Sequence, residues 1–230
     1  MSKITQVEPQ KTLRLRSGRR RFNIFLDGEF AFGADEDLVV SERLVPGKIV
    51  DENDLNHLIG EAEIGKLMEK MYRLFSVRQR SEKEVRDWFR IKNHELRIKG
   101  EEERCEMVVD QLVEKLKQKE MLNDLQFAKL WVEGRRRSKQ KSIRALKVEL
   151  MKKGIGREII EEATSDKSQE SSEEILAEKA LEKKIRVWKN LPKPEFKKKA
   201  ISYLMRQGFD YSLIKGILSN LVFFPEDDNI

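Results

Sequence analysis

Most of the chain places apolar residues at the spacing of an α-helix, and one short pattern of such residues occurs twice. Residues 150–155 read Leu-Met-Lys-Lys-Gly-Ile and are followed by Ile-Ile at 159–160. Residues 204–209 read Leu-Met-Arg-Gln-Gly-Phe and are followed by Leu-Ile at 213–214. Each copy predicts a helix that ends at a glycine, a tight turn and a second helix with an apolar face. A repeated pattern of this kind is typical of repeat proteins, which more often bind surfaces than catalyse reactions.

A third, less regular copy lies upstream of these two. Ser81 is a suitable helix N-cap, and Glu84 completes a capping-box arrangement three residues later. Aligning the helix ends places Asn93 where the other copies have glycine, and asparagine also tolerates a left-handed backbone. The alignment brings one apolar helix face into register in all three copies: Val85 and Phe89, Leu146 and Leu150, Ala200 and Leu204. A charged insertion at residues 94–104 follows the first copy only.

The repeating unit is predicted to contain three helices, namely a leading helix, a middle helix that ends at the turn, and a trailing helix. Trp131 and Trp188 lie on the apolar faces of two leading helices, where packing explains them better than ligand binding does. The expected fold class is therefore mainly α, with tandem three-helix repeats after a small β-rich arm. The expected divisions are the arm at 1–60, repeats at 61–121 and 122–164, a linker at 165–172, and a third repeat with a C-terminal tail at 173–230.

The N-terminal arm shows the alternating pattern of β-strands. Apolar residues alternate on either side of Asp27-Gly28, a dipeptide that favours a tight hairpin turn. We expect a short helix near residues 38–44 and a further strand at 48–50. Isolated hairpins are marginally stable in water, so the arm is expected to dock on the first helices.

Charge is distributed unevenly along the chain. Charged residues make up 38% of the sequence and the net charge is +6. Basic residues dominate three segments, 11–21, 129–153 and 183–199, whereas residues 158–182 are mainly acidic. Such alternation indicates a partner of mixed or periodic charge. The single cysteine, Cys105, cannot form an intramolecular disulfide, and no apolar run approaches the ~20 residues that span a bilayer. We therefore expect a cytoplasmic protein with no membrane association.

Residues suited to catalysis or metal binding are scarce. His57 and His94 have no carboxylate or cysteine at metal-ligand spacing, and Cys105 has no histidine nearby in the sequence to activate it. A phosphate-binding glycine loop is also missing from the sequence. We predict no catalytic residue, no metal site and no cofactor.

The strongest candidates for partner contact are basic residues. Closely spaced cations repel one another unless a polyanion or an acidic partner offsets their charge. A second group of candidates surrounds Trp88, which lies between basic residues as aromatic side chains do in some proteins that bind single-stranded nucleic acid. The predicted contact residues are Arg135, Arg136, Arg137, Lys139, Lys141 and Arg144, with Arg86 and Arg90 beside the tryptophan. The alternative interpretation of the larger cluster is a solvated helix end whose cations complement the helix dipole.

Several phrases, in order, resemble the RecX family of bacterial regulators of the RecA recombinase. Residues 80–86 read Arg-Ser-Glu-Lys-Glu-Val-Arg, and residues 120–128 read Glu-Met-Leu-Asn-Asp-Leu-Gln-Phe-Ala. The family usually has Gly-Leu-Leu-Asp-Asp-x-x-Phe-Ala at the second phrase, so Glu120 replaces a glycine. A basic run at 135–139 and the glycine turn near Gly154 continue the resemblance, which covers about residues 61–222.

The resemblance implies an elongated, curved array of three-helix repeats. It also implies a non-enzymatic monomer that binds the RecA nucleoprotein filament and inhibits the recombinase, ATPase and co-protease activities of RecA, thereby modulating DNA repair and the SOS response. Single- or double-stranded DNA is a further expected partner. Two alternatives remain open from the residues alone. One is a general nucleic-acid-binding helical repeat protein; the other is a helical adaptor with an unrelated partner.

Overall fold

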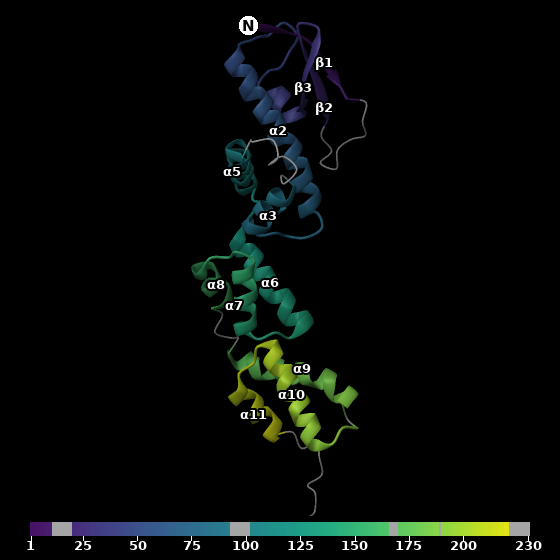
Figure 1. Ribbon diagram of the computed structural model, residues 1–230, viewed down its shortest axis with the longest axis vertical. Coiled ribbons are helices and arrows are strands. Elements are labelled where there is room, and N and C mark those ends of the chain that lie inside the picture. The colour runs from purple at the N-terminus through teal and green to yellow at the C-terminus, as the bar shows by residue number, and fades with distance from the viewer. Residues whose placement is uncertain (11–19, 93–101, 166–169, 189, 221–230) are drawn as a thin grey trace, which may run out of the picture. The chain divides into compact units, whose positions relative to one another are not determined.

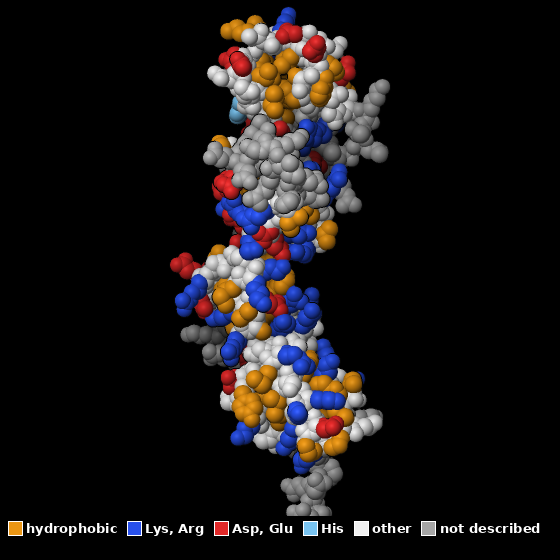
Figure 2. Space-filling model, in the orientation of Figure 1, with side chains coloured by type: hydrophobic (Ala, Val, Ile, Leu, Met, Phe, Trp, Pro, Cys, Tyr) orange, Lys and Arg blue, Asp and Glu red, His pale blue; other side chains and the backbone are white. Residues whose placement is uncertain are grey.

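The protein forms two compact units, Met1–Leu122 and Asn123–Ile230. The computed structural model describes residues 1–10, 20–92, 102–165, 170–188 and 190–220. The first unit combines a small sheet with helices, and the second unit is helical in its described residues (Figure 1). Charged side chains lie over the visible surface of both units (Figure 2).

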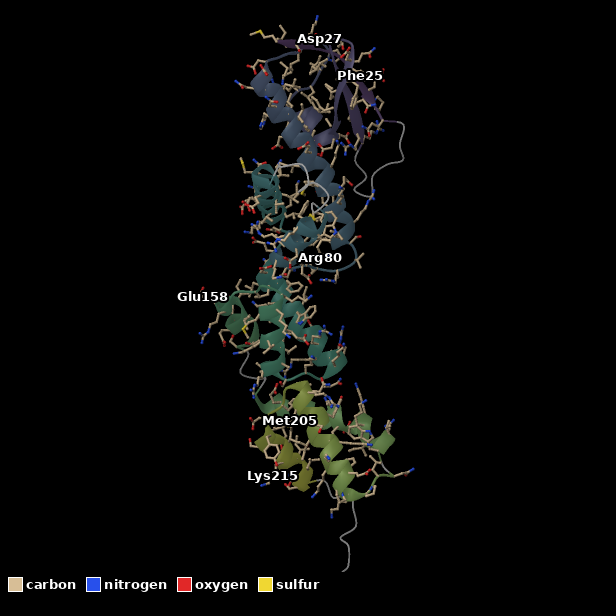
Figure 3. All side chains as sticks on the ribbon, viewed as in Figure 1. Phe25, Asp27, Arg80, Glu158, Met205 and Lys215 are labelled. Atoms are coloured by element: carbon tan, nitrogen blue, oxygen red, sulfur yellow. The ribbon has the colours of Figure 1, made fainter. Side chains whose placement is uncertain are left out.

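The N-terminal sheet has four antiparallel strands in the order β3-β2-β1-β4. The expected hairpin is confirmed, since β2 (Arg21–Leu26) and β3 (Glu29–Asp35) meet at Asp27 and Gly28, both with positive φ (Figure 3). The short helix is confirmed as α1 (Glu36–Ser41) and the further strand as β4 (Ile49–Val50). A strand that the sequence did not predict, β1 (Ser2–Pro9), lies between β2 and β4. Its pattern is weak because Ile4 is its only buried residue.

Helix α2 (Glu52–Phe75) connects the sheet to the first repeat. The Asp51 side chain caps it by accepting a hydrogen bond from the Asp54 amide at 2.8 Å. Leu58 and Ala62, near its start, pack in the core of the sheet, whereas the later Met68 packs in the core of the repeat. The expected division after residue 60 therefore falls inside a continuous helix.

The first repeat is completed by α3 (Glu82–Lys92) and α5 (Glu102–Gln118). The Ser81 cap is confirmed, because its buried hydroxyl accepts a hydrogen bond from the Glu84 amide at 3.3 Å. Val85 and Phe89 are buried on the face that the sequence pattern predicted. Asn93 and residues 94–101 of the charged insertion lie outside the described residues.

The second unit contains two three-helix repeats, each with its own apolar core. The first of them comprises α6 (Asp124–Lys139), α7 (Ile143–Lys152) and α8 (Arg157–Thr164). The other comprises α9 (Glu170–Trp188), α10 (Lys193–Gln207) and α11 (Tyr211–Asn220). Of the expected linker, residues 166–169 lie outside the described residues, and its last three residues belong to α9. The predicted mainly α fold class with a small N-terminal β arm is confirmed.

The repeated glycine phrase forms the same helix-ending turn in both copies. Gly154 and Gly208 have φ values of +79° and +92°, in the left-handed region. In the first copy the Ile155 amide donates to the Leu150 carbonyl at 3.1 Å. In the second copy the Phe209 amide donates to the Leu204 carbonyl at 3.2 Å. These bonds, with the buried apolar residue after each glycine, are those of a Schellman motif.

A third turn of this type ends α5 without a glycine. The Met121 amide donates to the Leu116 carbonyl at 3.0 Å, and Glu120 has a φ of +55°. A residue with a Cβ atom in this conformation costs roughly 1–2 kcal/mol. Position 120 therefore needs the conformation that a glycine adopts most readily.

The substitution Glu120→Gly is expected to stabilise the protein by about 0.5–1 kcal/mol. Relief of the left-handed strain exceeds the additional backbone entropy that glycine has in the unfolded chain. The urea midpoint of the full chain measures the effect. Lys119→Gly is the matched control, because Lys119 is not among the residues with positive φ. A midpoint that Glu120→Gly leaves unchanged or lowers would contradict the prediction.

Residues from both repeats of the second unit meet at the start of α7. The Ser142 amide donates to the Gln207 carbonyl at 3.1 Å, and the Ile143 amide donates to Glu173 Oε1 at 3.0 Å. Lys183 Nζ donates to Gln140 Oε1 at 3.1 Å. The third repeat therefore supplies hydrogen-bond acceptors for the N-terminus of a helix in the second repeat.

Candidate functional site

Two members of the predicted basic cluster, Arg135 and Lys141, form ion pairs with Glu149. Lys141 Nζ lies 2.5 Å from Glu149 Oε1, and Arg135 Nε lies 3.1 Å from Oε2. The indole Nε1 of Trp131 donates to the same carboxylate at 2.9 Å, and the Arg135 guanidinium lies over the indole ring. Burial alone would raise the pKa of Glu149, but the bonds from Lys141 and Trp131 and the nearby cations outweigh it and lower that pKa.

Arg136 points toward the third repeat. Its Nη1 lies 3.5 Å from Glu173 Oε1, and its side chain is only 13% exposed. Burial raises the pKa of Glu173, while the Ile143 amide and the Arg136 charge act in the opposite direction. Three of the six clustered cations are thus used within the fold and are poorly available to a partner.

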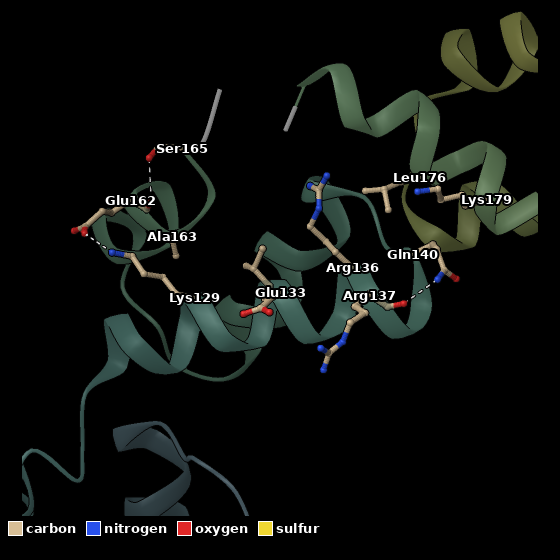
Figure 4. Close-up of a pocket in the computed structure, with 11 residues that line it drawn as sticks. Lys129, Glu133, Arg136, Arg137, Gln140, Glu162, Ala163, Ser165, Leu176 and Lys179 are labelled. Atoms are coloured by element: carbon tan, nitrogen blue, oxygen red, sulfur yellow. Dashed lines mark hydrogen bonds and ion pairs between the residues drawn. The ribbon is translucent and has the colours of Figure 1, made fainter. Parts of the chain in front are cut away.

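Arg137, Lys139 and Arg144 are the exposed members of the cluster. Figure 4 shows Arg136 and Arg137 leaving α6 on opposite sides. Arg144 lies near Asp210, whose pKa is lowered mainly by hydrogen bonds from Ser212, with a contribution from the arginine charge. Among the described residues, neither Arg137 nor Lys139 forms an ion pair.

The candidates beside Trp88 are also engaged in ion pairs. Arg86 binds Glu82 at 2.8 Å and Asp110 at 2.6 Å. Arg90 Nη1 lies 3.1 Å from an oxygen of Asp87. These pairs lie within the first repeat, so this face is much closer to electrical neutrality than its arginines alone suggest.

All three tryptophans pack inside their own repeats, which supports the packing interpretation. Trp88 makes an edge contact with Phe89, and Trp131 stacks on Phe127. Trp188 makes edge contacts with Phe196 and Tyr203. Trp188 also lines a surface groove that contains basic side chains.

That groove is a basic site that sequence reasoning missed. It lies in the third repeat and is lined by Trp188, Glu195, Lys198, Lys199, Ser202 and Arg206. The basic segment 183–199 overlaps this groove, but the denser Arg135–Arg137 triplet is the stronger signal in the sequence. Charge density in the sequence does not by itself show which cations are available, because dense cations also attract acidic partners within the fold.

The described residues contain no group of three or more His, Cys, Asp or Glu side chains that could hold a metal ion. Within the same part of the chain, no helix is both long and apolar enough to cross a membrane. His57 is exposed on α2, whereas His94 lies outside the described residues, as does the side chain of Cys105.

Three family models match successive parts of the chain. The "Regulatory protein RecX N-terminal domain" matches residues 2–51. The "RecX, second three-helix domain" matches residues 123–163, and the "RecX, third three-helix domain" matches residues 173–218. The matched ranges correspond to the sheet and to the two repeats of the second unit.

Curated relatives and solved structures agree with these matches. Regulatory protein RecX of Bacillus subtilis (strain 168) is 31% identical over 225 residues, covering 98% of this chain and 79% of the relative. The RecX protein of Listeria monocytogenes serotype 4b (strain F2365) is 29% identical over 216 residues, covering 93% of this chain and 73% of the relative. A crystal structure of regulatory protein RecX has a TM-score of 0.67 at 25% identity and covers 95% of this chain and 100% of its own. The crystal structure of RecX from Lactobacillus salivarius shares the fold, with a TM-score of 0.52 at 23% identity. The match covers 70% of this chain and 97% of that chain. From its N-terminal sheet to its third repeat, the chain belongs to the RecX family of regulatory proteins.

Proposed function

We propose that the protein is a non-enzymatic regulator that binds the RecA nucleoprotein filament and inhibits its recombinase, ATPase and co-protease activities. It acts as a cytoplasmic monomer. By inhibiting RecA it modulates DNA repair and the SOS response. Family membership supports a regulatory role, and the RecA filament is the partner that the resemblance implies. Inhibition follows from occupying the filament, so the protein needs no reactive group of its own.

The observation that carries the proposal is the presence of exposed cations that no described carboxylate neutralises. Arg137 and Lys139 at the end of α6 are of this kind. A nucleoprotein filament presents both phosphates and acidic side chains, and several weak contacts from one rigid scaffold combine into avidity. Exposed unpaired cations also accelerate encounter with such an anionic partner.

The double substitution Arg137→Glu and Lys139→Glu is expected to raise the concentration needed for half-inhibition by about tenfold, equivalent to ~1.4 kcal/mol. The assay is DNA-dependent ATP hydrolysis by purified RecA, with the full chain added below the amount that would coat the DNA. Helicity should be unchanged, because neither side chain takes part in an internal ion pair among the described residues.

Lys66→Glu with Lys70→Glu is the matched control. Both lysines are exposed on α2, and the two variants change the net charge equally. Equal weakening by both variants would mean that net charge, not the end of α6, governs binding. If the wild-type chain did not affect RecA at any concentration, the proposed function would be wrong.

A further inference from the structure

The groove of the third repeat combines cations with an aromatic wall. Lys198, Lys199 and Arg206 are exposed along α10, and Trp188 comes from the end of α9. Figure 2 shows Lys and Arg side chains spread over the surface of this repeat, with few acidic ones on the visible face. Among the described residues, none of these three cations forms an ion pair.

The same helix face is different in the other repeats. Alignment on Leu150 and Leu204 makes Arg144 and Lys152 of α7 equivalent to Lys198 and Arg206. In the second repeat this face is partly neutralised, since Lys141 pairs with Glu149 and Arg144 lies near Asp210.

The corresponding face of the first repeat carries its own counter-charges. Lys83 Nζ lies 2.5 Å from Asp87, and Arg78 binds Glu84 at 2.7 Å. Lys83, Asp87 and Glu84 align with Lys198, Ser202 and Lys199 of the third repeat. The third repeat therefore has Ser202 and Lys199 where the first repeat has the carboxylates that pair with Lys83 and Arg78.

The spacing of the unpaired cations indicates a chain-like ligand. Lys198 and Arg206 are eight residues apart, or about 12 Å along a helix that rises 1.5 Å per residue. One phosphate or carboxylate cannot contact both ends of this row, whereas consecutive charges on a polymer can.

The wall of the groove favours nucleic acid over an acidic peptide. Stacking or edge contact with an aromatic side chain stabilises a base of any sequence. Trp188 packs against Phe196 and Tyr203, but it is only partly buried and lines the groove. The hydroxyl of Ser202 adds a neutral hydrogen-bond donor of the kind that often contacts phosphate oxygens.

We propose that the Trp188–Arg206 groove of the third repeat binds the phosphate backbone of single-stranded nucleic acid. The site is distinct from the Arg135–Arg137 cluster and lies wholly in the third repeat. The inference deepens the proposed function. It rests on that function only in one respect, namely that the protein meets the single strand within the RecA filament. In that setting the groove would hold the DNA while other surfaces contact the recombinase.

The test uses the full chain and a dye-labelled oligothymidylate in fluorescence anisotropy. Replacing Lys198, Lys199 and Arg206 with glutamine is expected to weaken binding about tenfold near 0.1 M salt. For a single strand, each lost phosphate contact reduces the magnitude of the negative slope of log K against log salt by ~0.7, so this magnitude should fall by about 2. The charge-preserving variant K198R/K199R/R206K should bind like the wild type.

Lys66, Lys70 and Lys119, all exposed in the first unit, supply the matched control when replaced together with glutamine. An unchanged salt slope in the α10 variant, or an equal decrease in the control, would overturn the inference. If the α10 variant bound the oligonucleotide normally but lost inhibition of RecA, the groove would be a protein contact; the inference would then fail and the proposed function would stand. Loss of oligonucleotide binding by the α10 variant, with no inhibition of RecA even by the wild type, would support the groove and refute the proposed function.

Discussion

Gly208→Ala is expected to destabilise the second unit by about 2–5 kcal/mol. A Cβ atom at position 208 would lie 2.5 Å from Ser142 Oγ, 2.6 Å from Ala145 Cβ and 3.0 Å from the Ala145 amide nitrogen. Two of these atoms belong to the backbone or to a Cβ, so they cannot move aside by rotation. Overpacking of this kind costs about 1–3 kcal/mol, and the left-handed φ adds roughly 1–2 kcal/mol.

The experiment is urea denaturation of the full chain, followed by tryptophan fluorescence. Gly28→Ala is the matched control, because Gly28 has the same φ of +92° but no atom within 4 Å of an added Cβ. The control should therefore show only the conformational cost. Equal losses in the two variants would mean that the contact between α10 and the start of α7 contributes nothing.

Glu149→Ala is expected to cost about 2–4 kcal/mol at neutral pH. The substitution removes the acceptor of the Trp131 indole and leaves Arg135 and Lys141 close together without a counter-charge. Hydrogen bonds that involve a charged group contribute about 1.5–3 kcal/mol, and partial exposure of Glu149 keeps the total below that of a fully buried network. Glu133→Ala, at an exposed carboxylate of the neighbouring helix α6, should change stability by less than ~0.5 kcal/mol.

The contribution of Glu149 depends on pH in a definite direction. Because the folded protein lowers the pKa of this carboxyl, its stabilisation is complete above the ordinary value of 4.5 and is lost as pH falls through the lowered pKa. The stability difference between wild type and Glu149→Ala should thus shrink in acid. A difference that stayed constant between about pH 7 and pH 3 would show that Glu149 acts through packing alone.

Local patterns predicted much of the fold because local physics determines those features. Asp27-Gly28 specifies a hairpin turn, Ser81 caps a helix, and Gly154 and Gly208 end helices in a conformation that other residues resist. Strand β1 escaped prediction because its pairing with β2 and β4 depends on residues distant in sequence. Its own apolar pattern is too sparse to indicate a strand.

The cations that are available to a partner cannot be identified from the sequence alone, because the availability of a charge depends on partners far along the chain. Arg136 is paired with Glu173, 37 residues later, and Arg135 with Glu149 on the next helix. Lys198 and Lys199 have no such partner among the described residues. Their segment is less dense in charge than the arginine triplet, yet its cations are the more available ones.

The sequence by itself determined the three-helix unit, its repetition and the turns that end its helices, since propensity, capping and periodicity act within a few residues. Only the tertiary structure decided which cations remain available to a partner. Folding brings carboxylates such as Glu149 and Glu173 against some basic side chains and leaves others in solvent, and this choice depends on three-dimensional proximity. The glycine at position 208 shows both levels, because its conformation follows from the local turn while its close contact with Ser142 exists only after the two repeats have packed.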